Sequence, residues 1–271
     1  MSQLQVFLDI ASEAALQAGT VLQDKFRNLK NIEEKGRSGD LVTEADKAAE
    51  EIVLKVLNRH VPDHQILAEE SGTLGGNASK YLWTIDPLDG TTNYAHGYPI
   101  SAVSIGLMID GIPQVGVVYN PFRNELFRAA KGLGATCNHR PIQVSQTPQL
   151  KDTILVTGFA YDRRETTDNN YAEFCYLTHL TQGVRRSGSA SIDLTDVACG
   201  RLDGYWERGL SPWDITAGIV IVEEAGGLVT AYDKTPVDVS SGRLLVTNGK
   251  IHDSLSQALL ETPRFPENLY S

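Results

Sequence analysis

Two aspartates stand three residues apart in the segment WTIDPLDGTTN (83–93), directly after a short apolar run. Pro87 fixes one backbone torsion and Gly90 permits a sharp turn, so Asp86 and Asp89 could face one common space. Such a pair could bind Mg²⁺, which prefers oxygen ligands and usually keeps water and substrate phosphate in its coordination shell. The same two aspartates could instead form Asx-turns.

Carboxylates elsewhere in the chain could complete a metal site of this kind. Glu69 and Glu70 follow the apolar run 66–68, and Asp214 stands at the start of an apolar helical segment. Two aspartates alone would leave most positions around Mg²⁺ without a protein ligand, so the segments would have to converge. The alternative for Glu69 and Glu70 is a solvated surface position.

Asp46 and Asp214 each occupy the third position after a candidate helix N-cap. Thr43 precedes Asp46, while Ser211 and Pro212 precede Asp214 in the order favoured at helix starts. Capping alone would explain Asp46, and Asp214 could both cap its helix and bind a metal. The residue types leave both roles open.

Several other catalytic chemistries lack their motifs in this sequence. It contains no GxSxG, HExxH or GxxxxGK[ST] pattern, and no cysteine is followed by arginine six residues later. An EF-hand at 86–97 is excluded because glycine stands where the bidentate glutamate belongs.

Composition points to a folded, acidic protein. The 271 residues include 41% hydrophobic residues, enough for a buried core, and carry a net charge of −10, which disfavours nucleic acid as a partner. We expect a cytoplasmic location and no membrane partner, because no apolar run is long enough to span a bilayer and the first residues lack a signal-peptide pattern. The odd cysteine count and the absence of CxxC favour a reducing compartment and buried, unpaired thiols.

The elements that must position the acids begin with two helices. Apolar residues at steps of three and four predict an amphipathic helix over 3–27, and a second helix follows Thr43 and ends before Pro62. A mobile turn is expected at 35–40. Strands of a largely antiparallel sheet are then predicted at 65–68, 81–85, 101–109, 114–119 and 125–129.

The second half of the chain alternates helices and strands, which predicts layered α/β packing. Strands are expected at 153–157, 202–207, 228–230 and 244–247, and helices at 171–181, 189–199 and 213–225. No long linker separates the halves. We therefore expect a single domain, 1–271, with two closely packed halves at about 1–145 and 146–271.

The acidic motifs resemble those of the inositol monophosphatase family, within the lithium-sensitive sugar phosphatase superfamily. The resemblance rests on DPLDGTTN (86–93), WDITAG (213–218) and EAGG (224–227), and it extends through GDLVTEAD (39–46) and AEES (68–71). It implies a mixed α/β (α+β) fold, the layered αβαβα sandwich of the inositol monophosphatase and fructose-1,6-bisphosphatase type. It also implies a homodimer that hydrolyses phosphate monoesters with Mg²⁺ by direct attack of a metal-activated water.

The resemblance also implies roles for individual residues. The metal ligands, for two or three Mg²⁺ per site with Li⁺ as an inhibitor, would be Glu69, Asp86, Leu88 through its carbonyl, Asp89 and Asp214. The catalytic group would be Asp46, Glu70 and Thr91. The substrate contacts would be Gly90, Thr91 and Thr92 at the phosphate, and Gly188, Ser189, Ala190 and Glu207 at the ring.

Two of these implied roles have plain alternatives. Lys35 and Asp40 match a loop that closes near a third metal, but they could belong to a solvated turn. Glu207 could be a surface acid rather than an acceptor of a ring hydroxyl.

The expected activity is that of an inositol-phosphate phosphatase, acting on inositol 1-phosphate or a related cyclitol or sugar phosphate. Relatives with the same metal centre imply alternatives: fructose 1,6-bisphosphate, histidinol phosphate, sugar 1-phosphates or a nucleotide 3′-phosphate. A regulatory binding protein that keeps the fold is the alternative from another class, because a fold does not determine function.

Overall fold

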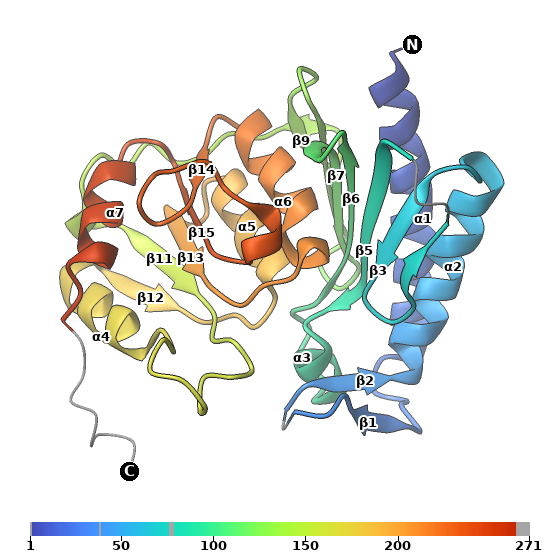
Figure 1. Cartoon of the computed structure of the whole chain (residues 1–271), viewed down its shortest axis with the longest axis horizontal. Coiled ribbons are helices and arrows are strands. Elements are labelled where there is room, and N and C mark those ends of the chain that lie inside the picture. The colour runs from blue at the N-terminus through green and yellow to red at the C-terminus, as the bar shows by residue number, and fades with distance from the viewer. Residues whose placement is uncertain (1, 38, 76–78, 264–271) are drawn as a thin grey trace.

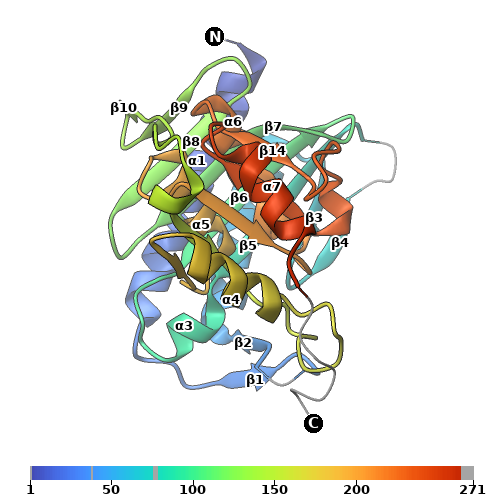
Figure 2. The ribbon, with the colours of Figure 1, turned by 90° about the vertical axis from the view of Figure 1, so that its left-hand side faces the viewer.

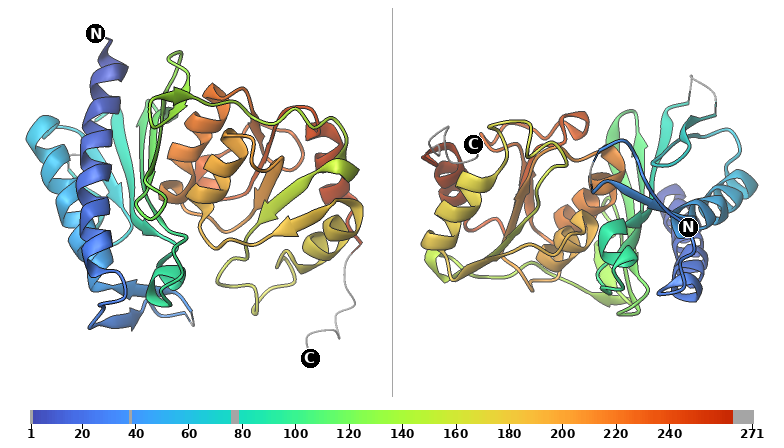
Figure 3. Two further views of the ribbon diagram at one scale, coloured as in Figure 1. Left: turned by 180° about the vertical axis from the view of Figure 1, so that it is seen from behind. Right: turned by 90° about the horizontal axis from the view of Figure 1, so that it is seen from below.

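Helices and sheets alternate in five layers in this computed structural model, which describes residues 2–37, 39–75 and 79–263. The order is helices α1 and α2, an eight-stranded sheet, helices α5 and α6, a five-stranded sheet, and helices α4 and α7 (Figure 1). The view from below shows the same succession (Figure 3, right). The predicted αβαβα architecture is confirmed.

The outer helices α1 (Gln3–Lys25) and α2 (Glu44–His60) agree with the predicted positions. Both lie against one face of the eight-stranded sheet, as the view from behind shows (Figure 3, left). The apolar stripe of α1 is fully buried at Ala11, Ala15, Ala18 and Leu22. This periodic burial is what the sequence pattern predicted.

The eight-stranded sheet has the order β10-β9-β8-β7-β6-β5-β3-β4. Strands β3 and β5 are parallel, and every other pairing among the described strands of this sheet is antiparallel, as predicted. The strands are β3 (Gln65–Ala68), β4 (Gly72–Leu74), β5 (Tyr81–Asp89), β6 (Ala102–Ile109), β7 (Ile112–Asn120), β8 (Glu125–Ala130), β9 (Ala135–Cys137) and β10 (Arg140–Pro141).

Side chains of this sheet alternate between two cores because successive residues of a strand point to opposite faces. In β7, Val117 packs in the core under α1 and α2, whereas Val118 packs in the core shared with α5 and α6. Burial on both faces explains why the strands are almost continuously apolar.

Helix α6 (Pro212–Glu224) packs very closely on the second face of this sheet. Gly106 and Gly116 pair in register; a Cβ at Gly106 would lie 2.6 Å from Thr216 Cγ2, and one at Gly116 would lie 2.1 Å from the Ala217 carbonyl oxygen. Only glycine permits this approach. The contact fixes α6, at whose start Asp214 lies, against β6, which is the neighbour of the strand β5 that carries Asp86 and Asp89.

The five-stranded sheet has the order β12-β11-β13-β15-β14. Helix α5 (Ala190–Ala198) lies with α6 on its inner side, while α4 (Tyr171–Leu180) and α7 (His252–Leu260) cover its outer side (Figure 2). Its strands are β11 (Ile154–Thr157), β12 (Gly183–Arg185), β13 (Gly204–Glu207), β14 (Leu228–Thr230) and β15 (Leu244–Thr247). The strands and helices predicted for the second half are confirmed.

Some features differ from the predictions. Strand β5 was expected to end at 85 but continues to Asp89, because pairing with β6 resumes at Asp89 and Ala102 after an irregularity. The turn at 35–40, of which residue 38 lies outside the described part, joins a short antiparallel pair, β1 (Ile32–Glu34) and β2 (Leu41–Thr43). Sequence reasoning also missed helix α3 (Thr91–Ala95), helix α7, strands β4, β9, β10 and β12, and the 3₁₀ turns at Leu150–Asp152 and Val239–Ser241.

The three cysteines are unpaired, as predicted, but the expected burial is wrong. Cys175 is exposed on α4, and Cys137 and Cys199 are half-buried. Within the described part of the chain, no helix has the length and apolar character needed to cross a bilayer.

Candidate active site

Asp86 and Asp89 lie on either side of an irregularity at the end of β5. Asp86 pairs with Ser104 of β6, and the next pairing is Asp89 with Ala102, so one extra residue is accommodated in β5. Asp86 Oδ1 accepts a hydrogen bond from the Leu88 amide at 3.0 Å, which is the Asx-turn considered from the sequence. Both aspartates are buried, so the turn is not formed at the surface.

Acids from three chain segments influence one another in this region. The carboxyl groups of Glu69 and Asp86 lie close enough to shift each other's pKa. Burial raises the pKa of Asp86 well above its usual range, and the negative charges of Glu69, Asp89 and Asp214 raise it further. Burial, followed by the charges of Asp89 and Glu69, does the same to Asp214. The segments therefore lie near one another, as the sequence suggested.

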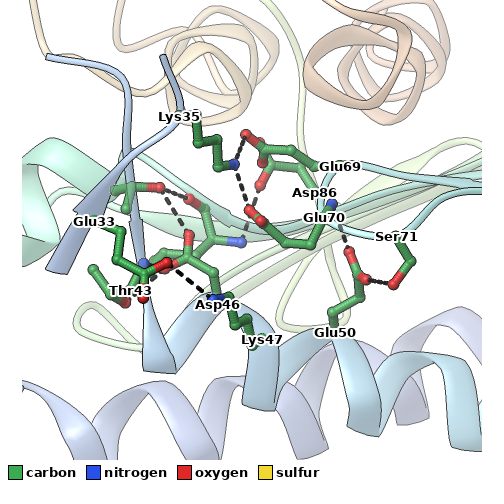
Figure 4. A network of polar contacts seen from close by, with 12 residues as sticks. Glu33, Lys35, Thr43, Asp46, Lys47, Glu50, Glu69, Glu70, Ser71 and Asp86 are labelled. Atoms are coloured by element: carbon green, nitrogen blue, oxygen red, sulfur yellow. Dashed lines mark hydrogen bonds and ion pairs between the residues drawn. The ribbon is translucent and has the colours of Figure 1, made fainter. Parts of the chain in front are cut away.

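Lys35 reaches from the turn between β1 and β2 to two of these acids (Figure 4). Its Nζ lies 2.9 Å from Glu69 Oε1 and also donates a hydrogen bond to Glu70. Burial raises the pKa of Glu70 to about 7, although Lys35 acts in the opposite direction. Asp40 accepts a hydrogen bond from the Lys35 amide through its carbonyl oxygen at 2.8 Å. The alternative that Glu69 and Glu70 are simply solvated is wrong.

Glu50 is a residue that sequence reasoning missed. Its Oε2 accepts a hydrogen bond from the Glu70 amide at 2.9 Å, and its Oε1 accepts one from the Ser71 hydroxyl (Figure 4). Glu50 is almost fully buried on α2, four residues after Asp46 and thus on the same helix face. An acid on the inward face of an amphipathic helix was the signal that could have revealed it.

Asp46 joins the cap of α2 to Thr91. Its Oδ2 accepts hydrogen bonds from the Thr43 amide at 2.8 Å and the Thr43 hydroxyl at 2.6 Å, which completes the predicted capping box. Its Oδ1 lies 3.0 Å from Thr91 Oγ1, which also lies 2.9 Å from the Leu88 carbonyl oxygen. Asp46 therefore has a cap function and a second partner in the site.

Asp89 connects the first sheet to the start of α5. Its Oδ2 accepts hydrogen bonds from the Ser189 hydroxyl at 2.7 Å, the Ser191 amide at 2.7 Å and the Ser191 hydroxyl at 2.5 Å. Ser191 was not among the expected site residues. Asp214 has a comparable local role at α6, where its Oδ2 accepts a hydrogen bond from the Ser211 amide at 2.6 Å.

The segments expected to contact phosphate and ring adjoin these acids. Gly90 has a φ of 88°, a left-handed conformation that glycine tolerates, and it turns the chain into α3. Thr92 Oγ1 lies 3.3 Å from the Gly39 carbonyl oxygen, which ties α3 to the Lys35 turn. Asn93 of α3 donates a hydrogen bond to the Ser187 carbonyl at 2.8 Å, beside Gly188.

Glu207 ends β13 and is 8% exposed, so the surface-acid alternative is wrong. Its Oε2 accepts a hydrogen bond from the Tyr205 hydroxyl at 2.7 Å. Burial raises the pKa of Glu207 to about 7; the Tyr205 hydrogen bond and the charge of Arg186 oppose this rise.

The donor types in this region fit a hard divalent cation. Glu69, Asp86, Asp89 and Asp214 offer only oxygen atoms. Burial raises the pKa of all four, and neighbouring acids raise those of Glu69, Asp86 and Asp214 further, an effect that added positive charge would relieve. Within 2–37, 39–75 and 79–263, no three acids, histidines or cysteines already surround one point at ligand distance. Lys35 and the seryl groups at Asp89 hold the carboxylates in other hydrogen bonds.

Comparison with known proteins relates this chain to the inositol monophosphatases. Residues 3–263 match the model of the inositol monophosphatase family. The inositol-1-monophosphatase of Synechocystis is 67% identical over 264 residues, covering 97% of this chain and 92% of that protein. The solved inositol monophosphatase of Anabaena (Nostoc) superposes with a TM-score of 0.91 at 64% identity, covering 97% of this chain and 99% of that one. The Nus factor SuhB of Pasteurella multocida is 42% identical, covering 90% of this chain and 92% of that protein.

Proposed function

The chain belongs to the inositol monophosphatase family, whose members are phosphatases, and we propose that it hydrolyses inositol 1-phosphate or a closely related cyclitol or sugar phosphate with Mg²⁺. The observation that carries this proposal is the contact between Asp46 and Thr91 beside the Leu88 carbonyl, together with the neighbouring carboxyls of Glu69 and Asp86, which act on each other's pKa. A proton acceptor and a set of oxygen donors thus adjoin each other.

The residues proposed to hold two or three Mg²⁺ are Glu69, Asp86, Leu88 through its carbonyl, Asp89 and Asp214. When bound, Mg²⁺ supplies the positive charge that brings an anionic ester to a chain with a net charge of −10 and stabilises the phosphate oxygens. The same acids give Li⁺ a position from which to inhibit. Lys35 and Asp40 belong to the adjoining turn, where the family resemblance suggests a third ion.

Thr91 and Asp46 are proposed to take a proton from the attacking water. Thr91 has one hydroxyl proton; when it donates this proton to Asp46, its oxygen keeps two lone pairs and can accept the proton of water. Burial raises the pKa of Asp46, which makes its carboxylate a stronger base. Glu70 is proposed to orient the water, and Glu50 holds the Glu70 backbone in place.

The remaining contacts are proposed to bind the ester itself. The backbone amides of Gly90 and Thr91, with Thr92 beside them, face the phosphate, and Gly188, Ser189 and Ala190 line the ring. Glu207 accepts a hydrogen bond from a ring hydroxyl. The Asn93 contact with Ser187 supports this division, because it ties the phosphate segment to the ring segment.

A phosphate-release assay across several esters tests the proposal. The panel contains inositol 1-phosphate, fructose 1,6-bisphosphate, histidinol phosphate and a nucleotide 3′-phosphate, each with and without Mg²⁺. We expect the highest kcat/KM for inositol 1-phosphate and no turnover once Mg²⁺ is chelated. A higher kcat/KM for another ester of the panel would make that ester the assigned substrate. Turnover without any divalent ion would refute the metal assignment.

A regulatory binding function is a second candidate, favoured by the similarity to a Nus factor. It predicts a macromolecular partner and is supported if no ester in the panel releases phosphate. The proposal otherwise includes a homodimer in the cytoplasm, with no nucleic-acid or membrane partner. Light scattering of the purified protein tests the dimer, and the family resemblance supports it.

A further inference from the structure

We propose that Tyr205 and Gly158 are positioning residues that hold the Glu207 carboxylate and thereby select esters of hydroxylated alcohols. This inference rests on the proposed function, in which Glu207 contacts the alcohol part of the substrate. Neither residue was among the expected site residues.

Tyr205 and Glu207 are two residues apart on β13, so their side chains leave the strand on the same face. The Tyr205 hydroxyl donates a 2.7 Å hydrogen bond to Glu207 Oε2, and Tyr205 is fully buried. The phenol ring cannot swing away from the carboxylate without disturbing the packed core. One of the two carboxylate oxygens is therefore committed to a protein donor.

Gly158 limits the carboxylate from another side. A Cβ at residue 158 would lie 2.2 Å from both Glu207 oxygens, so the backbone after β11 lies directly against the carboxylate. The Gly158 carbonyl accepts a 2.7 Å hydrogen bond from the buried Asn170 side chain, which holds this backbone in place. Any side chain at 158 would displace Glu207.

The segment that follows Gly158 is fastened to the end of β13. Arg208 pairs with Asp162, and a Cβ at Gly209 would lie 2.6 Å from Ala160 Cβ. Strands β11 and β13 are also neighbours, with Thr157 opposite Trp206. Glu207 thus sits in a rigid frame rather than on a free surface.

Within the described part of the chain no side-chain or backbone donor bonds Oε1, so we assign this oxygen as the acceptor for a ligand hydroxyl. Because this oxygen is held in one direction, it favours the binding of an ester whose alcohol has a hydroxyl at the matching position. It makes no hydrogen bond to an ester whose alcohol has no hydroxyl. Other charged or titratable groups that act on Glu207 or are influenced by it are Arg186, Arg208, Asp89, Asp193, Asp214 and Tyr232.

The test compares Tyr205→Phe and Gly158→Ala with wild type on two esters, inositol 1-phosphate and p-nitrophenyl phosphate, which has no alcohol hydroxyls. We expect KM for inositol 1-phosphate to rise by about threefold to tenfold, the range of one lost hydrogen bond. We expect kcat on both esters and KM for p-nitrophenyl phosphate to change by less than about twofold. Equal effects on both esters, or no effect on either, would overturn the inference.

Tyr119→Phe is the matched control, because it also removes the hydroxyl of a buried tyrosine; this hydroxyl lies 3.3 Å from Asn124 Oδ1. Tyr119 packs in the core under α1 and α2, on the opposite face of the eight-stranded sheet from α5 and α6. Near-ultraviolet circular dichroism checks that each variant folds. Titration of isotope-labelled glutamate carboxyl groups by NMR adds a readout independent of activity. The pH midpoint of the Glu207 carboxyl titration should rise in Tyr205→Phe and should not change in Tyr119→Phe. If it changes in neither variant, the hydrogen bond from Tyr205 to Glu207 is contradicted.

Failure of the proposed function can be distinguished from failure of this inference. A wild type that releases no phosphate from inositol 1-phosphate refutes the substrate assignment, and with it the ring selectivity. The contact between Tyr205 and Glu207 is then still judged by the titration.

Discussion

The acids near β5 and the single acid at the end of β13 are both buried, but their surroundings differ in kind. Asp86 has three acidic neighbours that add to the effect of burial on its pKa, whereas the effect of burial on Glu207 is opposed by Tyr205 and Arg186. A group of like charges is stabilised by a cation, while one acid with its own hydroxyl donor needs none. The first environment suits phosphate held through metal, and the second suits a neutral alcohol.

Among the substitutions that compare these two regions, Asp89→Asn should have the largest effect on activity. We expect kcat to fall by about 10²–10³-fold, because one anionic ligand is lost while the amide oxygen still accepts the Ser191 hydrogen bond. Steady-state kinetics at saturating Mg²⁺ measure this. Asp9→Asn, at an exposed ion pair with Arg128, is the control and should retain full activity. Wild-type turnover in Asp89→Asn would remove Asp89 from the metal site.

Replacing Thr91 by Val should be nearly as damaging. We expect kcat to fall by about 10²-fold, since the path from water to Asp46 loses its hydroxyl. Thr91→Ser keeps the hydroxyl and should stay within about tenfold of wild type in the same assay. If Val and Ser variants behave alike, the hydroxyl has no part in proton transfer.

The environment of Glu207 should be visible in the pH dependence of the free energy of unfolding rather than in kcat. Because the pKa of Glu207 is raised from 4.5 to about 7, the folded state keeps a proton that the unfolded chain releases. Stability from this group is therefore full below about pH 4.5 and is lost as the pH rises through about 7. Glu207→Gln should remove this decline, which amounts to about 3–4 kcal/mol in full, since the interval from 4.5 to about 7 corresponds to about 1.4 kcal/mol per pH unit. Urea unfolding of wild type and Glu207→Gln at about pH 4.5 and about pH 7, both with chelator present, measures how much of the decline the substitution removes. The prediction is contradicted if the free energy of unfolding changes equally with pH in the two proteins.

Glu50→Gln should have the smallest effect of these substitutions, and it should change only the affinity for Mg²⁺. Glutamine keeps the shape but weakens the hydrogen bonds to Glu70 and Ser71, so we expect the Mg²⁺ concentration for half-maximal rate to rise by about threefold to tenfold. The neighbouring exposed Glu51→Gln is the matched control and should not change it. Calorimetric titration with Mg²⁺ gives the same comparison without turnover. An unaltered Mg²⁺ affinity would make Glu50 purely structural.

Much of the fold could be predicted because its cause is local. Apolar periodicity located α1 and α2, and the spacing of Thr43 to Asp46 and Ser211 to Asp214 located two helix starts. The Asx-turn at Asp86, which the sequence offered as an alternative to metal binding, forms because an aspartate two residues before an amide needs no distant partner. The end of β5 was misplaced because it depends on pairing with β6.

By itself, the sequence determined the helix caps, the apolar faces of the layers and the motifs of the acidic cluster, since torsional preference and periodicity act between near neighbours. Only the tertiary structure decided that Lys35 meets Glu69, that Glu50 holds Glu70, and that Ser191 meets Asp89 across 102 residues. The close approach of α6 at Gly106 and of Gly158 to Glu207 belongs to the same class. Such contacts depend on how whole layers pack, and no local pattern carries that information.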